Sequence, residues 1–276
     1  MGAGVRAAAP ARRAAADFAS GEETLVSEFP ANSPSAAAPS AVLSIVVPCY
    51  NERATIGNVV EAVLNADACQ LRKEVVIVDD CSRDGTREFL PELAARYAAD
   101  ARGSVRVCYH EVNQGKGAAL RTGFRQATGD LVIIQDADLE YDPRDYPQLL
   151  QPILENRADV VYGNRFHGGA HRVLYFWHFQ ANRLLTMICN MLSDLNLSDM
   201  EVGYKIFRRE VLAQLTLHSN RFGFEPEVTI KTARLRVRIY EVPIAYHGRT
   251  YDEGKKIGWR DGMAALWHMF RYRFLE

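Results

Sequence analysis

The feature that most constrains the fold of this chain is an alternation of short apolar runs with longer amphipathic stretches, beginning at Leu43. The apolar runs predict buried strands, and they cover 43–47, 74–78, 105–109, 131–135 and 159–163. The stretches between them have helical spacing and cover 55–66, 86–99, 117–127 and 146–156. Because strands that alternate with helices favour βαβ units, the sequence predicts an α/β fold with a mainly parallel sheet.

The two ends of the chain differ from this regular middle part. Residues 1–41 are rich in Ala, Pro, Ser and Gly, a composition that cannot offset the entropy of ordering, so we expect a flexible arm. The folded domain is then 42–276. Its second half predicts helices over 173–193, after Phe224 and from about Trp259, and strands at 203–207 and 237–242.

Composition excludes several classes of protein. The chain has 276 residues and a net charge of −1, which excludes a nucleic-acid-binding protein that acts through bulk positive charge. No stretch reaches the roughly 18 uninterrupted apolar residues of a spanning helix, and no signal peptide is expected. The five cysteines form no CxxC pair, which indicates reduced thiols and no structural zinc. We therefore expect a cytoplasmic protein, either soluble or peripheral on the cytoplasmic face of a membrane.

A polar cluster follows each of the five predicted strands. The clusters read PCYNE, DDCSRDGT, NQGKG, DADLE and GNRF in chain order. In open α/β sheets, ligands bind at the carboxyl ends of the strands. We therefore expect these five clusters to meet at one rim of the sheet.

Asp136 and Asp138 are the strongest candidates for chemistry at this rim. Residues i and i+2 of an extended segment point the same way, so both carboxylates can face one divalent cation. Mg²⁺ or Mn²⁺ prefers such oxygen ligands. The alternative is a solvated acidic loop, because Glu140, Asp142 and Asp145 follow.

Two further clusters fit the recognition of a nucleotide. Asp79 and Asp80 end the second predicted strand, where they can bind a nucleobase and ribose or cap the turn before Thr86. The turn 113–117 opens a helix and carries Lys116, whose cation can reach a phosphate. It is not a Walker loop, because the glycine and hydroxyl positions of that motif do not match.

The ordered set PCYNE, VDDCSRDGT, NQGKGAALRTG and QDADLEYDP resembles the family 2 glycosyltransferases. Within that family the chain is similar to the branch of dolichol-phosphate mannose synthases and polyprenyl-phosphate glucosyltransferases, from about residue 43 to the C-terminus. The resemblance implies a GT-A fold: a mainly parallel nucleotide-binding sheet flanked by helices, with a C-terminal acceptor-side region and a terminal amphipathic helix. The chain departs from the mannose synthases where Lys205 stands in place of an Arg, so the resemblance does not fix the donor sugar.

The resemblance also implies roles for individual residues. The nucleoside pocket would be lined by Pro48, Tyr50, Glu52, Val78 and Asp80, with the last two against the base. The metal and the sugar diphosphate would be held by Asp136, Ala137 and Asp138, with Asp138 also catalytic. Cations near the diphosphate would be Arg165, Arg249 and Lys255. Lys116 and Arg121 also match the motif, either in the donor site or in an Arg–carboxylate clamp that holds the rim.

The reaction implied is an inverting, metal-dependent transfer of a hexose from a nucleotide sugar, of UDP-glucose or GDP-mannose type, to a polyprenyl phosphate. A lipid phosphate is anionic near neutral pH and needs no general base. A sugar or other hydroxyl acceptor would need one, and Asp199 and Glu201 are then the candidates. Their alternative role is structural, bonding the strand start and Lys205.

The predicted C-terminal helix has an apolar stripe formed by Trp259, Met263, Leu266, Trp267 and Phe270, and Phe274 continues it. With its basic flank, residues 255–276 can lie on a membrane surface or contact a membrane subunit. The stripe can equally pack on the sheet.

Two other classes of protein share part of this sequence pattern. A phosphoacceptor signalling domain also carries an acidic pair like Asp79 and Asp80, but such domains are shorter and hold the modified Asp closer to the pair. A non-catalytic relative would bind sugar nucleotide as a scaffold, but the retained Asp136 and Asp138 give no support to that reading.

Overall fold

The computed structural model describes residues 1–2, 41–166, 171–173, 175–250 and 259–276, and for 259–261 the backbone alone. The predicted arm, residues 1–41, lies outside the described residues apart from 1–2 and 41. The first strand begins at Val42, where the folded domain was expected to begin.

Seven strands form one sheet in the order β3-β2-β1-β4-β6-β5-β7. Their bounds are β1 Val42–Cys49, β2 Arg72–Asp79, β3 Gly103–Tyr109, β4 Leu131–Ile134, β5 Val160–Asn164, β6 Lys205–Arg208 and β7 Ile239–Pro243. Strand β6 pairs antiparallel with both β4 and β5, and the other pairings are parallel. The predicted α/β fold with a mainly parallel sheet is therefore confirmed.

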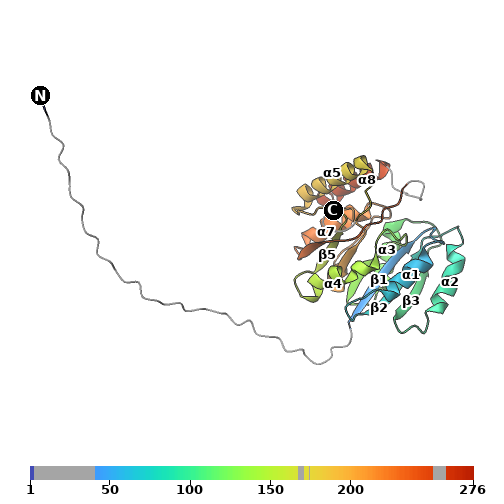
Figure 1. The fold of residues 1–276 in the computed structure, drawn as a ribbon. Coiled ribbons are helices and arrows are strands. Elements are labelled where there is room, and N and C mark those ends of the chain that lie inside the picture. Colours follow the sequence, from blue (N-terminus) through green and yellow to red (C-terminus); the bar gives the residue numbers. More distant parts are fainter. Residues whose placement is uncertain (3–40, 167–170, 174, 251–258) are drawn as a thin grey trace, which may run out of the picture. The chain divides into compact units, whose positions relative to one another are not determined.

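The helices flank this sheet (Figure 1). Their bounds are α1 Ile56–Asn65, α2 Thr86–Arg96, α3 Lys116–Gln126, η1 Pro143–Asp145, α4 Tyr146–Leu154, α5 Phe176–Ser193, α6 Arg209–Leu212, α7 Phe224–Arg234 and α8 Trp259–Phe274. The long helix α5 begins at Phe176, three residues later than predicted. The short helices η1 and α6 have too few residues to show a period, and the sequence pattern did not predict them.

The alternation of side chains along β2 shows how the sheet is covered on both faces. Val75 and Ile77 belong to the main core, which includes the buried side of α1. Val76 and Val78 point the other way and pack with Ala119 of α3. A parallel strand covered on both faces is apolar throughout, which is why these runs were easily recognised in the sequence.

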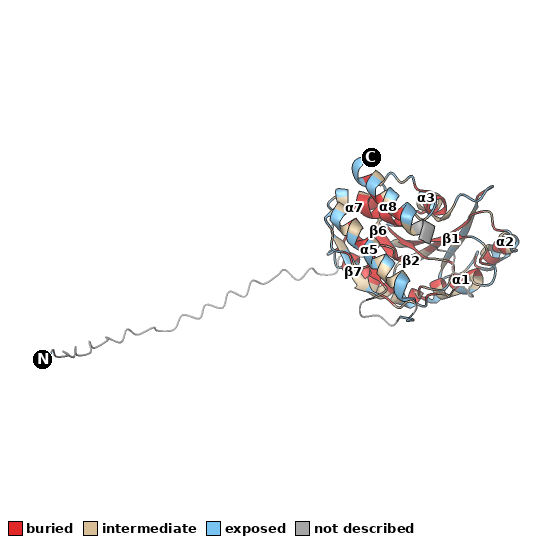
Figure 2. Cartoon of the chain, turned by 90° about the horizontal axis from the view of Figure 1, so that it is seen from above, coloured by how far each residue is buried: buried red, intermediate tan, exposed pale blue. Residues whose placement is uncertain are grey.

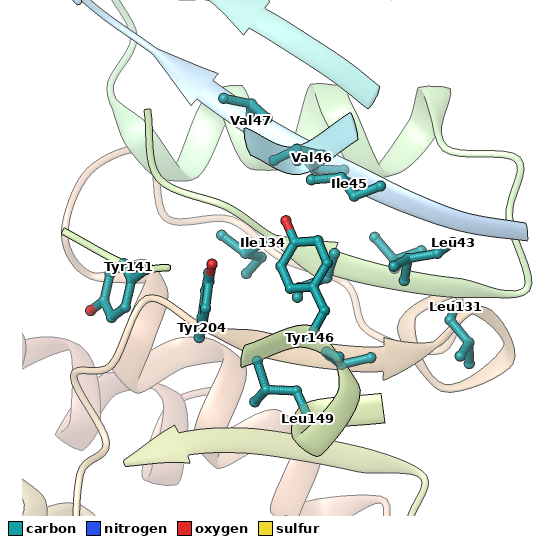
Figure 3. Close-up of a cluster of buried hydrophobic side chains, with 14 of the residues drawn as sticks. Leu43, Ile45, Val46, Val47, Leu131, Ile134, Tyr141, Tyr146, Leu149 and Tyr204 are labelled. Atoms are coloured by element: carbon teal, nitrogen blue, oxygen red, sulfur yellow. The ribbon is translucent and has the colours of Figure 1, made fainter. Parts of the chain in front are cut away.

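A group of buried tyrosines connects β4 to β6 (Figure 3). Tyr146 and Tyr204 each donate a hydrogen bond to Oε1 of the buried Gln135, over 2.8 and 2.6 Å. The ring of Tyr141 stacks on that of Tyr204, and its hydroxyl accepts a hydrogen bond from the Gly203 amide over 2.8 Å. These satisfied polar groups hold the segment after β4 against the segment before β6.

Helices α5, α7 and α8 pack together into a second, smaller core. Its buried members are Cys189, Met200, Ile230, Ala265, Met269 and Tyr272. In the part of the chain that the structure describes, no helix has the length and apolar character needed to cross a bilayer. No disulfide joins any of the five cysteines, all of which the structure describes, and Cys49 and Cys189 are buried as expected of small core residues.

Candidate active site

Loops at the carboxyl ends of the strands are tied together by hydrogen bonds. The Asn51 amide after β1 donates to Ser82 Oγ after β2 over 2.9 Å. Thr55 Oγ1 donates to the carbonyl oxygen of Ala137 after β4 over 2.7 Å. The polar clusters after β1, β2 and β4 therefore meet at one rim, as the parallel strand order requires.

The residues predicted to line a nucleoside pocket lie in or directly after β1 and β2. Pro48 is half-buried and pairs in register with the fully buried Val78. Tyr50 is partly exposed, whereas Glu52 is buried and its Oε2 lies 2.8 Å from Thr55 Oγ1. The structure brings these residues together, and their contact with a nucleoside stays a prediction.

The buried carboxylate of Asp80 holds the turn that precedes α3. Its Oδ1 accepts from the Gln114 amide and lies 2.7 Å from His110 Nδ1, and its Oδ2 accepts from the Gly115 amide over 2.7 Å. Gly115 has φ +98°, and a Cβ there would lie 2.5 Å from the Asn220 carbonyl oxygen, so only glycine fits. Asp80 therefore fixes the start of α3 and with it Lys116. Its predicted contact with a base remains untested.

Each carboxylate of the DAD segment forms an ion pair with a cation from another element. Lys116 Nζ lies 2.9 Å from Asp136 Oδ1. Arg249 Nη2 lies 2.8 Å from Asp138 Oδ2. All four side chains are largely shielded from solvent. The structure therefore brings together two predicted acidic residues and two predicted cations.

The acidic residues of this segment crowd one another. Burial, together with the charges of Asp136 and Glu140, raises the pKa of Asp138 to about 7. Arg249 opposes this rise and also lies 3.3 Å from Glu52 Oε1 and 3.5 Å from Glu140 Oε1. The excess of negative charge means that further positive charge would be stabilising here.

This donor set fits a hard divalent cation. Asp136 and Asp138 supply carboxylate oxygens, the ligand type that Mg²⁺ and Mn²⁺ prefer. Among the described residues, no group of three or more His, Cys, Asp or Glu side chains is arranged to hold a metal. A cation at this place would therefore need water and phosphate oxygens to complete its coordination, which is the usual situation for Mg²⁺.

Buried charges continue beneath Lys116. Glu225 at the start of α7 lies 3.4 Å from Lys116 Nζ, and its buried Oε2 has no hydrogen-bond partner in the part of the chain that the structure describes. Burial lowers the pKa of Lys116, but the nearby Asp136 and Glu225 charges outweigh burial, so the net effect raises it. Sequence reasoning gave Glu225 no role; the only signal was a pair of glutamates, FEPE, in the first turn of a helix.

Arg165 and Asp199 form a buried bidentate ion pair. Arg165 Nε and Nη2 donate to the two carboxylate oxygens of Asp199 over 2.6 and 2.7 Å. Asn182 of α5 donates to Oδ1 over 3.1 Å, so both oxygens of Asp199 are occupied. Arg165 lies at the end of β5 as expected, and its approach to donor phosphates stays a prediction.

Glu201 and Lys205 lie close to this ion pair. Lys205 Nζ is fully buried, donates to the carbonyl oxygens of Met200 and Val202, and lies 4.9 Å from the ring centre of Tyr162. Burial and the charge of Glu225 raise the pKa of Glu201 to about 8. Burial lowers the pKa of Lys205, also to about 8.

The predicted clamp at Arg121 is wrong in one respect. Among the described residues, its guanidinium donates to the carbonyl oxygens of His218 and Ser219 and to Asn220 Oδ1, and to no carboxylate. The segment before α7 presents its backbone oxygens to α3, and a planar guanidinium fits that array. Lys255, the remaining predicted cation, lies outside the described residues.

The fold and this rim define a glycosyltransferase of the GT-A type. The crystal structure of glucosyl-3-phosphoglycerate synthase from Mycobacterium tuberculosis, in complex with Mn²⁺, UDP and glucosyl-3-phosphoglycerate, superposes with a TM-score of 0.64. The match covers 84% of this chain and 80% of that chain at 20% identity, so it shows the fold.

The chain belongs to glycosyl transferase family 2, whose family model matches residues 44–216. The undecaprenyl-phosphate mannosyltransferase of Micrococcus luteus is 31% identical, and the match covers 83% of this chain and 97% of the relative. The dolichol-phosphate mannosyltransferase of Pyrococcus furiosus is 29% identical over 78% of this chain, which spans 59% of that protein. The chain is thus a hexosyltransferase, and the phosphoacceptor signalling alternative is wrong.

Proposed function

We propose that this hexosyltransferase transfers a hexose from a nucleotide sugar to a polyprenyl phosphate at a membrane surface, with a divalent metal ion. We assign the reaction to residues 42–276 as one catalytic domain. The observation that carries the acceptor assignment is a set of exposed apolar side chains on two helices that pack against each other, α5 and α8. We call it the α5–α8 face, and its residues are Trp177, Leu184, Met187, Met191, Met263, Trp267, Phe270 and Phe274.

The α5–α8 face is separate from the surfaces that hold these helices in the fold. On α8, Met263, Trp267, Phe270 and Phe274 recur at helical spacing, so they share one side. The opposite side packs through Ala265, Met269 and Tyr272, with Leu266 also against the smaller core. Both helices carry pale-blue, exposed stretches in Figure 2.

This arrangement corrects two sequence-based expectations. The alternative in which the C-terminal stripe packs on the sheet is wrong, because Met263, Trp267 and Phe270 are exposed. Leu266, placed in the same stripe, belongs to the packed side. The side chain of Trp259 lies outside the described part of the chain.

The face is connected to the site through α5 itself. Asn182 lies on α5 and hydrogen-bonds Asp199, which in turn holds Arg165 at the end of β5. We propose that a lipid bound at the α5–α8 face presents its phosphate toward Arg165. Arg183 and Arg273 are exposed on the same two helices, and cations beside an apolar face favour anionic lipid surfaces.

The donor side of the reaction needs positive charge around a diphosphate. Asp136 and Asp138 would hold the metal, which when bound neutralises charge developing on the leaving nucleoside diphosphate. Lys116 and Arg249 lie on either side of these carboxylates and supply two protein cations to the same region. The relative from Mycobacterium has been crystallised with Mn²⁺ and UDP-glucose, which supports a sugar-nucleotide donor and a metal.

The acceptor side needs no proton acceptor if a phosphate attacks. A phosphate oxygen that is already anionic can displace the diphosphate from the opposite face of the sugar, with inversion. Both oxygens of Asp199 already accept hydrogen bonds from Arg165 and Asn182, so this carboxylate is poorly placed to take a proton from a hydroxyl acceptor. This set of contacts favours a phosphate acceptor over a hydroxyl acceptor.

The direct test incubates the protein with vesicles that contain polyprenyl phosphate and with a radiolabelled donor, either UDP-glucose or GDP-mannose. We expect a lipid-linked product with one donor, its loss in EDTA, and its loss in Asp138→Asn. Asp142→Asn is the matched control, because Asp142 follows in the same segment but pairs with the exposed Arg144. Product formation on a soluble hydroxyl acceptor, with none on the lipid phosphate, would contradict the proposal.

A further inference from the structure

The two cations beside the DAD carboxylates each have a second acidic partner. Lys116 lies between Asp136, at 2.9 Å, and Glu225, at 3.4 Å. Arg249 lies between Asp138, at 2.8 Å, and Glu52, at 3.3 Å. Each cation therefore contacts one predicted metal ligand and one further acidic residue. The further acidic residue can still pair with the cation when a metal ion binds the predicted ligand.

The two cations come from differently constrained parts of the chain. Lys116 is the first residue of α3, behind the turn that Asp80 fixes. Arg249 follows β7, and its backbone amide donates to Glu140 Oε1 over 2.9 Å. Both therefore have fixed attachment points, and long side chains can move between partners while the backbone stays in place.

The hydrogen bonding of this arrangement is incomplete. Glu225 Oε2 is buried and has no hydrogen-bond partner among the described atoms, and the buried Arg249 Nε forms no hydrogen bond there, although it lies 3.5 Å from Glu140 Oε1. Buried polar atoms are normally paired, and an unpaired one costs free energy. The two ion pairs thus leave these polar atoms without hydrogen bonds. If the Lys116 and Arg249 side chains move toward a bound diphosphate, these atoms can gain hydrogen bonds.

We propose that Lys116 and Arg249 act as internal counterions that compete with the divalent metal for Asp136 and Asp138. A metal ion competes with the ammonium and the guanidinium for these carboxylate oxygens, because like charges repel at such distances. A nucleoside diphosphate offers the displaced cations new anionic partners. Metal and nucleotide therefore bind cooperatively, and this inference rests on the donor and metal assigned under the proposed function.

Cooperativity of this kind is reciprocal. If the nucleotide raises the affinity for metal by a given factor, metal raises the affinity for nucleotide by the same factor. Removing a competing cation has two separable effects: it tightens metal binding to the free protein, and it weakens the coupling. Loss of a residue that only stabilises the fold would not both tighten metal binding to the free protein and weaken the coupling between metal and nucleotide.

Mn²⁺ binding measured by electron paramagnetic resonance, with and without UDP or GDP, tests this directly. In the wild-type protein, one nucleotide should tighten Mn²⁺ binding at least about tenfold. Lys116→Met should bind Mn²⁺ alone at least about tenfold more tightly and lose most of that coupling. Lys116→Arg, which keeps the charge, should stay close to wild type.

Two further variants keep the test decisive. Arg249→Met removes the counterion of Asp138 from the segment after β7, whereas Lys116 is the first residue of α3, so it tests the idea even if loss of Lys116 prevents folding. Lys231→Met is the matched control, because Lys231 also lies between two carboxylates, Glu227 and Glu276, outside the rim. It should bind Mn²⁺ as wild type does.

Two results would overturn the inference. Nucleotide-dependent Mn²⁺ binding that is unchanged in Lys116→Met and Arg249→Met would refute the counterion role alone and leave the proposed function standing. Wild-type protein that binds no Mn²⁺ with either nucleotide would refute both the metal assignment and the counterion role.

Discussion

Replacing Trp267 by Gln should weaken binding to phospholipid vesicles without weakening the fold. Trp267 is 56% exposed, whereas α8 is held by the opposite side through Ala265 and Met269. Since a tryptophan buries about 150–250 Å², about 100 Å² of this side chain is left for contact with lipid. At about 25 cal/mol per Å², transfer of that area is worth about 2.5 kcal/mol.

The assay is co-sedimentation with vesicles that contain anionic phospholipid. A loss of about 2.5 kcal/mol corresponds to a fall in the partition coefficient of between about tenfold and a hundredfold. Trp177→Gln on α5 should act in the same direction, because this residue is 78% exposed. Thermal unfolding should change little, since exposed side chains contribute little to stability.

Leu154→Gln supplies the matched control for the vesicle experiment. Leu154 is also an exposed apolar residue, but it lies at the end of α4 and outside the α5–α8 face. Its substitution should leave vesicle binding unchanged. The reasoning is refuted if Trp267→Gln sediments with vesicles as well as wild type does, or if Leu154→Gln weakens binding equally.

Three further predictions concern catalysis, pH dependence and packing. If the acceptor is a phosphate, Asp199→Ala and Glu201→Ala should keep measurable turnover; complete loss of turnover in a folded variant would favour a hydroxyl acceptor. The pKa of Glu201 is raised from its ordinary 4.5 to about 8 in the folded protein. Between these two pH values the folded chain keeps this proton and the unfolded chain has lost it, so the free energy of unfolding falls as pH rises. Glu201→Gln should reduce that fall in urea titrations at pH 5.5 and 8, and an unchanged slope would contradict it. Gly123→Ala places a Cβ onto Val46, so it should lower the free energy of unfolding by about 1–3 kcal/mol in urea denaturation, with wild-type stability as the contrary result.

The sheet was predictable because its signal is local. Strands such as β1 and β2 are covered on both faces, so they appear as continuous apolar runs. The antiparallel strand β6 was located by its apolar residues, but its place between β4 and β5 was not predictable. Strand order depends on long-range pairing, which a single sequence does not display.

The site was predictable as a set of residues but not as a set of contacts. The resemblance placed Asp136, Asp138, Lys116 and Arg249 in one functional region, and the structure brings them together. It did not indicate which cation meets which carboxylate. Glu225 was missed because its role follows from its distance to Lys116. A pair of glutamates in a helix does not predict that contact.

The sequence by itself determined the alternation of strands and helices, and with it a rim where polar loops gather. Those properties depend on side-chain periodicity over a few residues, which each segment carries within itself. Only the tertiary structure decided that Arg249 pairs with Asp138, 111 residues away, and that α8 packs through Met269 while Trp267 faces outward. Ion pairs and exposed faces depend on distances between distant segments, and those distances exist only once the chain has folded.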